Sequence, residues 1–198
     1  MTSSARPVAL GWRQASAPLE WGVEEDTMPE TLPLPDSPRQ GVERFELSAV
    51  PLAVARYDNV SMSELRTLFD TTFQAMAAAI GADKVHPAGP ALAVYHGDPS
   101  QTFDVEIGFP VVEPIREKTL VGDVTIQNST LPAGAAAGAS HLGSFDGLGE
   151  SWGRLIQDLR DSGDEPGFMV EIYVTEPSPD MNPDDLRTDI IVSLAQRG

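Results

Sequence analysis

The chain has 198 residues, of which 13 are lysine or arginine and 30 are aspartate or glutamate, for a formal net charge of −17. This charge argues against nucleic-acid binding, which needs a basic footprint, and against anionic membranes; it favours cationic small molecules, although a solvated acidic surface accounts for it equally well. The absence of cysteine excludes disulfides and thiolate sites. No apolar run is long enough to span a membrane, and the first residues lack the apolar core of a signal peptide. We therefore expect a cytoplasmic protein.

Residues 1–43 differ in composition from the rest of the chain. They hold six prolines and an acidic run at 24–26, and neither a helical nor a strand period continues across them. We therefore expect an irregular N-terminal arm, followed by a folded domain over residues 44–198. Disordered tails are poor in aromatic residues, so Trp12 and Trp21 predict that the arm docks on the domain or reaches a pocket or a partner.

The remainder looks like an internal duplication, with one copy over residues 45–111 and a second over 124–195. Each copy shows an alanine-rich strand, a turn, a helix, and two further strands joined by a loop rich in proline and aspartate. Residues 112–123 would connect the copies. The pattern predicts an α+β fold of two β-α-β-β units, with antiparallel sheets and one long helix in each unit.

Both helices have recognisable start and stop signals. The candidates are Ser61 or Ser63 as the first cap with Gly81 as the stop, and Ser144 or Asp146 as the second cap with Gly163 as the stop. Apolar residues recur between these signals at a spacing of 3.6, which predicts amphipathic helices packed on the core. Trp152 belongs to the apolar stripe of the second helix, where a tryptophan is more often a core residue than a ligand contact.

A single acid interrupts the apolar strand GFMVEIYV at 167–174. Burying a carboxylate is costly unless another group pairs with it, so Glu171 is the anomaly of this strand. Strand alternation places Glu171 on the same face as Met169 and Tyr173. An acid beside an aromatic residue in a sheet suggests a pocket for a cation. The alternative is that Glu171 lies on the solvated face of an antiparallel sheet.

Alternation also sorts the strands of the first copy. Ala93 and Tyr95 share one face of their strand, and Glu106 is an acid within the next strand. If the helices cover the valine and isoleucine faces, these side chains look away from the helices, as do Glu171 and Tyr173. Small residues such as Ala93 would then leave room for a ligand. The alternative for Glu106 is an acid that forms hydrogen bonds within the sheet.

No motif indicates a metal or another cofactor. The three histidines lack the spacing of metal ligands, and no phosphate-binding loop of the GxxxxGK type occurs. We therefore expect the protein to work without a metal and without a cofactor.

Four stretches together resemble the GyrI-like effector-binding domain family. They are FDVEIGFPV at 103–111, LPAG at 131–134, SHLGSFDGLGESWGRL at 140–155 and GFMVEIYVTEP at 167–177. The resemblance begins near residue 45 and continues to the C-terminus. It implies that the two units are related by a pseudo-twofold axis and that a ligand cleft lies between them.

The resemblance also implies roles for individual side chains. Glu171 matches the buried pocket glutamate of the family, which faces the positive centre of hydrophobic cations, and Glu106 matches a commonly acidic position. Trp152 matches the helix tryptophan of the motif, and His141 matches its histidine, for which we expect a structural role. The expected ligand-binding residues are Glu171, Tyr173, Tyr95, Glu106, Met169, Trp152, Phe145 and Ala93.

Three functions follow from the resemblance for a stand-alone member, which we expect because residues 1–43 are too rich in proline for a DNA-binding helix-turn-helix. The first is a multidrug-type protein that binds hydrophobic, cationic aromatic compounds. The second is a hydrolase that opens cyclopropane-type alkylating toxins with water, in which Glu171 is the general base and Tyr173 or Trp152 orients the substrate. The third is a module that binds a protein partner such as gyrase. The residues favour binding and leave the other two open.

Overall fold

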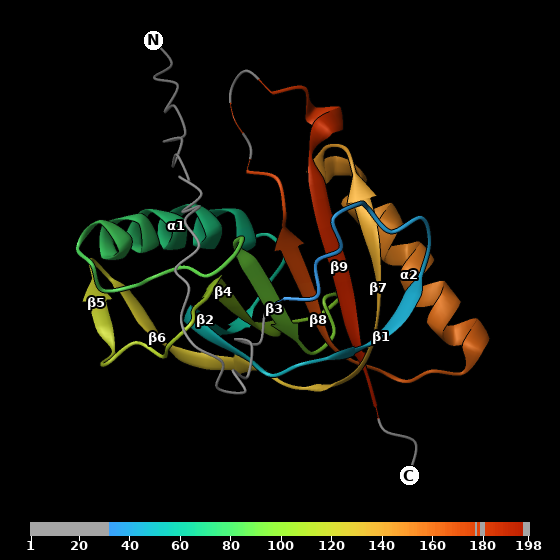
Figure 1. The fold of residues 1–198 in the computed structure, drawn as a ribbon, viewed down its shortest axis with the longest axis horizontal. Coiled ribbons are helices and arrows are strands. Elements are labelled where there is room, and N and C mark those ends of the chain that lie inside the picture. The colour runs from blue at the N-terminus through green and yellow to red at the C-terminus, as the bar shows by residue number, and fades with distance from the viewer. Residues whose placement is uncertain (1–31, 177, 179–180, 196–198) are drawn as a thin grey trace, which may run out of the picture.

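The computed structural model describes residues 32–176, 178 and 181–195. Most of the expected N-terminal arm, including Trp12 and Trp21, lies outside these residues. Within them the chain forms an α+β structure in which two helices pack against a β-sheet (Figure 1). No helix in the described part of the chain is long and apolar enough to cross a membrane.

The order strand, helix, strand, strand recurs along the chain. It appears as β2-α1-β3-β4 and again as β7-α2-β8-β9. The helices are α1 (Leu65–Gly81) and α2 (Leu148–Ser162), with short 3-10 helices η1 (Phe145–Gly147) and η2 (Pro183–Asp185). The strands are β1 (Glu43–Leu47), β2 (Val50–Val60), β3 (Leu92–His96), β4 (Phe103–Pro110), β5 (Thr119–Val121), β6 (Val124–Leu131), β7 (Gly134–Leu142), β8 (Pro166–Tyr173) and β9 (Arg187–Leu194).

These strands form one antiparallel sheet in the order β1-β7-β9-β8-β3-β4-β2-β6-β5. We predicted a separate sheet for each copy, and this is wrong because β3 of the first copy pairs with β8 of the second. That pairing leaves no free sheet edge between the copies. It places Glu171 on an interior strand, with β3 on one side and β9 on the other.

A two-stranded ribbon links the far ends of the sheet. Leu47 pairs with Gly134 and Val50 pairs with Leu131, so the register of β1 on β7 continues without a shift into that of β2 on β6. The two ribbon halves nevertheless occupy distant positions in the strand order. The sheet must therefore curve, which encloses apolar side chains on the face opposite the helices.

Both helices cover the face to which Glu171 points. The side chains of α2 pack with Ile190 of β9, and those of α1 pack with Ala93 of β3. Ala93 and Ile190 are the two cross-strand neighbours of Glu171 and share its face. We considered the case in which the helices cover the valine and isoleucine face, and the structure shows the opposite arrangement. Apolar side chains occupy both faces of β8, so its pattern could not identify the helix side.

The first residues of the N-terminal segment (residues 32–42) cover the opposite face of the sheet, while Val42 at its end packs on the side of α2. On the opposite face Leu32 is buried and Leu34 is half-buried, and both pack with Val170 and Ile172. We had assigned this segment to an irregular arm. Its apolar residues instead complete the core on the side without helices, so the expected boundary between residues 43 and 44 divides a packed region.

Buried ion pairs fix the N-terminal segment to β9. The carboxylate of Asp189, which is fully buried, accepts hydrogen bonds from Arg39 at 2.9 Å and from Arg187 at 2.8 Å. The same guanidinium groups donate to the carbonyl oxygens of Pro33, at 2.6 Å, and Pro35, at 3.0 Å. Two arginines therefore connect the segment to a single acid in the sheet.

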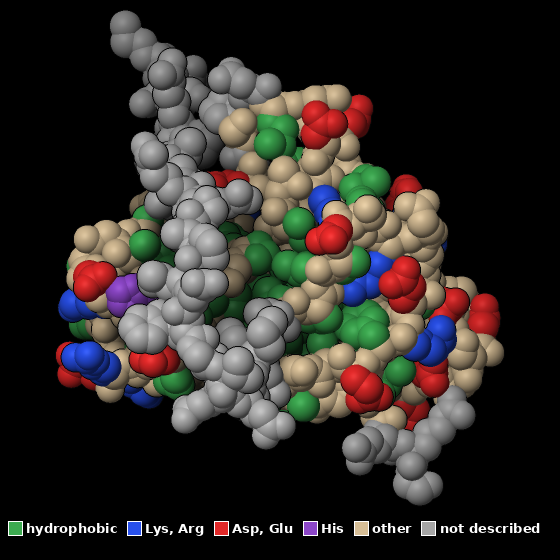
Figure 2. All heavy atoms as spheres, viewed as in Figure 1, with side chains coloured by type: hydrophobic (Ala, Val, Ile, Leu, Met, Phe, Trp, Pro, Cys, Tyr) green, Lys and Arg blue, Asp and Glu red, His purple; other side chains and the backbone are tan. Residues whose placement is uncertain are grey.

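Acidic side chains are dispersed over the face of the molecule that Figure 2 shows. Figure 2 shows acidic side chains distributed around the visible face, while hydrophobic side chains gather in a hollow near its centre. This distribution agrees with a solvated surface as one source of the net charge of −17.

Candidate ligand-binding site

The site is built around the carboxylate of Glu171. Its side chain lies on the helix-covered face of β8, where only 9% of the residue is exposed. Ala93, the residue opposite on β3, is fully buried and has no side-chain atom beyond Cβ. The small partner leaves space above the sheet that the side chains around Glu171 fill.

Three neutral donors hold this carboxylate. Oε2 accepts a hydrogen bond from the Tyr173 hydroxyl at 2.7 Å and one from the Tyr95 hydroxyl at 2.9 Å. Oε1 accepts a hydrogen bond from the indole Nε1 of Trp152 at 2.8 Å. These donors come from β8, β3 and α2, so the site needs both copies of the duplicated unit.

Within the described part of the chain, this buried acid has no positively charged partner. Among the residues that the structure describes, no lysine, arginine or histidine lies within ion-pair distance of Glu171. Hydrogen bonds offset part of the cost of burying a charge, but they do not neutralise it. The site therefore presents a negative charge in apolar surroundings, which is the arrangement that favours a cation.

The two tyrosines remain protonated donors. Burial raises the pKa of the Tyr95 hydroxyl well above its ordinary value, and the charge of Glu171 raises it further. Burial and the same charge also raise the pKa of Tyr173. Both hydroxyls are thus neutral around pH 7. They donate hydrogen bonds to the carboxylate and leave its negative charge in place.

Aromatic rings surround the hydroxyl end of the site. Phe69 of α1 and Phe145 of η1 each meet the ring of Tyr173 edge-on, with centroids 5.8 and 5.9 Å apart. Met169 of β8 is half-buried and packs with the core clusters under both helices. These contacts bring six of our predicted side chains together around Glu171. Phe69 joins them, although it is not among the residues that we predicted for the site.

Glu106 does not belong to this site, contrary to our prediction. Its partner on β3 is Val94, whereas the partner of Glu171 is Ala93, and consecutive residues of a strand point to opposite faces. Glu106 instead accepts hydrogen bonds from Ser129 at 2.8 Å and Arg56 at 3.2 Å. This is the alternative that we considered, an acid that forms hydrogen bonds within the sheet.

Electrostatics support the same role for Glu106. Burial by itself would raise the pKa of its carboxyl, but the nearby His96 imidazole, the Ser129 hydroxyl and Arg56 outweigh it and hold the pKa below the ordinary value. Glu106 thus already has its charge partners and does not need a ligand.

His141 connects β7 to the start of α2. Its Nε2 lies 2.8 Å from the carbonyl oxygen of Ser144, which can only accept, so Nε2 donates. Its Nδ1 lies 2.9 Å from Ser151 Oγ. These contacts agree with the structural role that we expected for the motif histidine. The sequence carried no signal for Ser151 as its partner.

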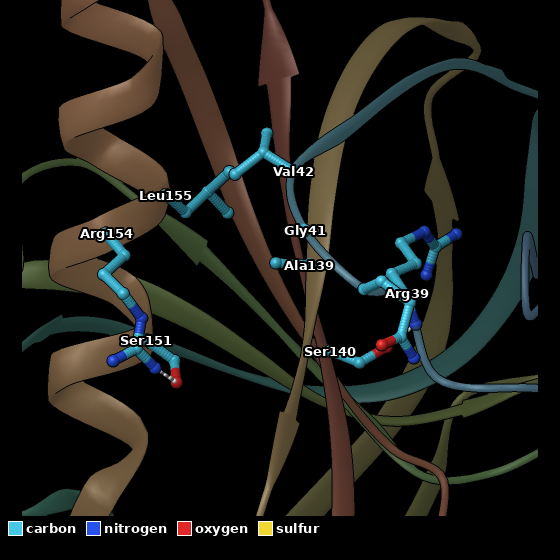
Figure 3. A pocket seen from close by; sticks show the side chains of 9 residues that line it. Arg39, Gly41, Val42, Ala139, Ser140, Ser151, Arg154 and Leu155 are labelled. Carbon is cyan, nitrogen blue, oxygen red and sulfur yellow. Dashed lines mark hydrogen bonds between the residues drawn. The ribbon is translucent and has the colours of Figure 1, made fainter.

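A separate cavity lies elsewhere on the molecule. Figure 3 shows this cavity, of about 270 Å³, between the N-terminal segment, β7 and α2. Arg39, Ser140, Ser151 and Arg154 contribute its polar lining, and Arg154 donates a hydrogen bond to Ser151 Oγ at 2.8 Å. None of the predicted ligand-binding residues lines it. No group of three or more acidic, histidine or cysteine side chains in the described residues is arranged to hold a metal.

Comparison with protein families finds one match. The model of the GyrI-like family, a GyrI-like small molecule binding domain, matches residues 52–195. A search of curated proteins finds no match.

Solved structures share this fold at low sequence identity. The chain resembles EcmrR in the EcmrR–DNA complex, with a TM-score of 0.63 and 16% identity; the match covers 79% of this chain and 57% of EcmrR, so the chain spans little more than half of that protein. It resembles SAV2435 bound to tetraphenylphosphonium, with a TM-score of 0.58 and 11% identity; the match covers 79% of this chain and 94% of SAV2435. It also resembles a hydrolase encoded by lin2189 from Listeria innocua, with a TM-score of 0.54 and 12% identity; the match covers 81% of this chain and 94% of the hydrolase. At these identities the likeness establishes the fold alone.

Proposed function

Because the chain belongs to the GyrI-like small molecule binding domain family, we propose that it binds hydrophobic, cationic aromatic compounds with Glu171 as the counter-charge. One observation carries the proposal. Glu171 is a buried carboxylate with three neutral hydrogen-bond donors and no basic partner among the described residues. A bound cation would supply the positive charge that the described residues around Glu171 do not supply.

The energies are sufficient for useful affinity. Each contact between a cation and an aromatic ring contributes roughly 0.5–2 kcal/mol, and Tyr173, Trp152 and Phe145 lie around the carboxylate. Micromolar binding requires about −8 kcal/mol. A few such contacts, the charge of Glu171 and the burial of apolar ligand surface at about 25 cal/mol per Å² reach that value. The tetraphenylphosphonium bound to SAV2435, which shares the fold, supports this ligand class.

Two ligands of matched shape test the proposal directly. Tetraphenylphosphonium and tetraphenylborate present four phenyl rings around a central atom and carry opposite charges. We expect isothermal titration calorimetry to show binding of the cation and much weaker binding of the anion. Equal affinity for the two ions would show that Glu171 does not select charge and would refute the proposal.

A hydrolase is the second candidate. The observation in its favour is a carboxylate in apolar surroundings beside two neutral tyrosine hydroxyls, the kind of environment in which a glutamate can activate water. Weighing against it, three donors already occupy most of the roughly four acceptor positions of a carboxylate, which leaves one for a water. The test is to incubate the protein with a cyclopropane-bearing alkylator and search for a water adduct by mass spectrometry.

Four further expectations remain predictions. A role as a partner of gyrase rests on the acidic surface, and a role in drug resistance rests on the proposed ligand class. The pseudo-twofold relation between the two units rests on their repeated order of elements. The fourth expectation is a cytoplasmic location, which agrees with ligand binding, with hydrolysis and with a gyrase partner.

A further inference from the structure

Phe145 is the outermost aromatic ring over the ligand-binding site. Its side chain meets Tyr173 edge-on, and the Tyr173 hydroxyl donates to Glu171. Phe145 is nevertheless 45% exposed, whereas Tyr95 and Glu171 are buried. An apolar ring in this position shields the inner residues from solvent while it is itself in contact with solvent.

The backbone that carries Phe145 is short and bounded by glycines. The 3-10 helix η1 has three residues, and Gly147 is its last, directly before α2 begins. Gly143 lies two residues before Phe145 and has a φ of 116°, a value that side chains rarely permit. Short turns with glycine at their ends are suited to move as a unit relative to the elements that they join.

One side chain holds this turn against the sheet. The carbonyl oxygen of Ser144, directly before Phe145, accepts hydrogen bonds from His141 Nε2 at 2.8 Å and from the Gly147 amide at 3.1 Å. His141 is itself buried on β7, where it pairs with Thr188 of β9. A Cβ atom at Gly147 would lie 3.1 Å from the imidazole Cε1, so the ring lies directly against the turn. The position of Phe145 thus depends on His141.

We propose that the Phe145 ring is a movable cover over the Glu171 site, which we call the door. His141 is the positioning residue that holds this ring against Tyr173. The proposal rests on the proposed function for the identity of the ligand. When an aromatic cation enters the site, Phe145 loses its contact with Tyr173 and the cation contacts Tyr173 in its place. The door therefore limits the rates of entry and exit more than the affinity.

Exchange kinetics test the door. In Phe145→Ala, both association and dissociation of the cationic dye rhodamine 6G, followed by stopped-flow fluorescence, should become about two- to tenfold faster, as expected for loss of one edge-on aromatic contact. The dissociation constant should change less than either rate. Phe69→Ala is the matched control, because Phe69 also meets Tyr173 edge-on but lies within α1. It should weaken affinity without faster association.

A double-variant comparison tests His141. His141→Phe removes the hydrogen bond to Ser144 and should accelerate exchange as Phe145→Ala does. Ser151→Ala removes the hydrogen bonds that Ser151 Oγ forms with His141 and Arg154, but it keeps the one between His141 and Ser144, so it should leave the rates unchanged. If His141 acts through the door, then His141→Phe adds nothing in a Phe145→Ala background. An additive effect would mean a general structural role and would overturn the assignment of His141.

A measurement without ligand separates this inference from the proposed function. Hydroxyl-radical labelling, read by peptide mass spectrometry, should increase at Tyr173 and Trp152 in Phe145→Ala and in His141→Phe, with Tyr57 as the internal reference. Increased labelling in a protein that binds no cation would refute the proposed function and retain the door. Unchanged labelling in both variants would refute the door whether or not the protein binds cations.

Discussion

Glu171 and Glu106 point to opposite faces of one sheet, because their partners on β3 are the consecutive residues Ala93 and Val94. Glu171 has three neutral donors, while Glu106 has Arg56 and Ser129 as partners. The two acids are both buried, on adjoining parts of the same sheet. They form a matched pair in which, within the described residues, Glu106 has a positive partner and Glu171 has none.

This pair yields the first prediction. Glu171→Gln should weaken binding of tetraphenylphosphonium by on the order of 1–3 kcal/mol, because it removes a charge-assisted partner of the cation. Glu106→Gln should leave that affinity unchanged, since its side chain faces away from the site. Calorimetric titration of the two variants provides the comparison. Equal losses in both would mean that the total negative charge, and not the site, selects cations.

The second prediction concerns the hydroxyls of Tyr95 and Tyr173. Their pKa values are raised in the folded protein by burial and by Glu171, so the protonated form is favoured in the folded state. The resulting stability is fully present below the unfolded value of about 10 and is lost as the pH rises through the folded values. Urea denaturation should show a free energy of unfolding that falls above about pH 10.

The variant Glu171→Gln is the control for this pH dependence. In Glu171→Gln the charge contribution disappears while burial remains, so both tyrosines should ionise at lower pH than in the wild type. The ultraviolet absorbance of phenolate reports this directly. Identical titrations of the two proteins would contradict the hydrogen-bonded arrangement around Glu171.

The third prediction concerns the ion pairs of Asp189. Asp189→Asn leaves the buried Arg39 and Arg187 without their acid, and breaking a buried pair typically costs about 3–5 kcal/mol. Asp158→Asn is the control, because Asp158 pairs with Arg44 at the surface, where a pair contributes about 1 kcal/mol or less. Denaturant unfolding measures both. A small loss in Asp189→Asn would mean that water replaces the missing carboxylate.

The fourth prediction compares two truncations. Deletion of residues 1–40 removes Leu32 and Arg39, whereas deletion of residues 1–31 retains them. The longer deletion should unfold at lower denaturant concentration, because Asp189 loses a partner and the apolar face of the sheet loses its cover. The difference between the two truncations isolates residues 32–40. If both unfold alike, then the N-terminal segment contributes nothing to the core.

The fifth prediction addresses catalysis. If the protein hydrolyses cyclopropane-bearing alkylators, Glu171→Gln should reduce the rate by about 10²–10⁴, the usual contribution of a general base, with a smaller loss of binding. Mass spectrometry of the water adduct supplies the rate. A wild-type protein that binds such compounds and yields no adduct above background performs binding alone.

The sequence by itself predicted the two helices and their neighbouring strands, and it identified the acid around which the candidate site is built. The 3.6 spacing predicted α1 and α2 with their stops at Gly81 and Gly163, close to the observed ends. The predicted serine and aspartate caps are wrong, because α1 begins after Glu64 and α2 after Gly147, and neither residue forms a side-chain cap hydrogen bond. The single acid in an apolar strand identified Glu171, and alternation identified Met169 and Tyr173 as its companions on β8. These signals are local, because they depend on the geometry of one helix or one strand.

The tertiary structure decided which faces came together. Alternation sorts residues within a strand, but only the register between strands shows that Glu171 lies opposite Ala93 and that Glu106 lies opposite Val94. The pairing of β3 with β8 merged the two copies into one sheet, and the N-terminal segment covered the valine and isoleucine face of β8. Each of these outcomes joins residues far apart in the sequence, and apolar side chains on both faces of β8 are compatible with either arrangement until those partners are in place.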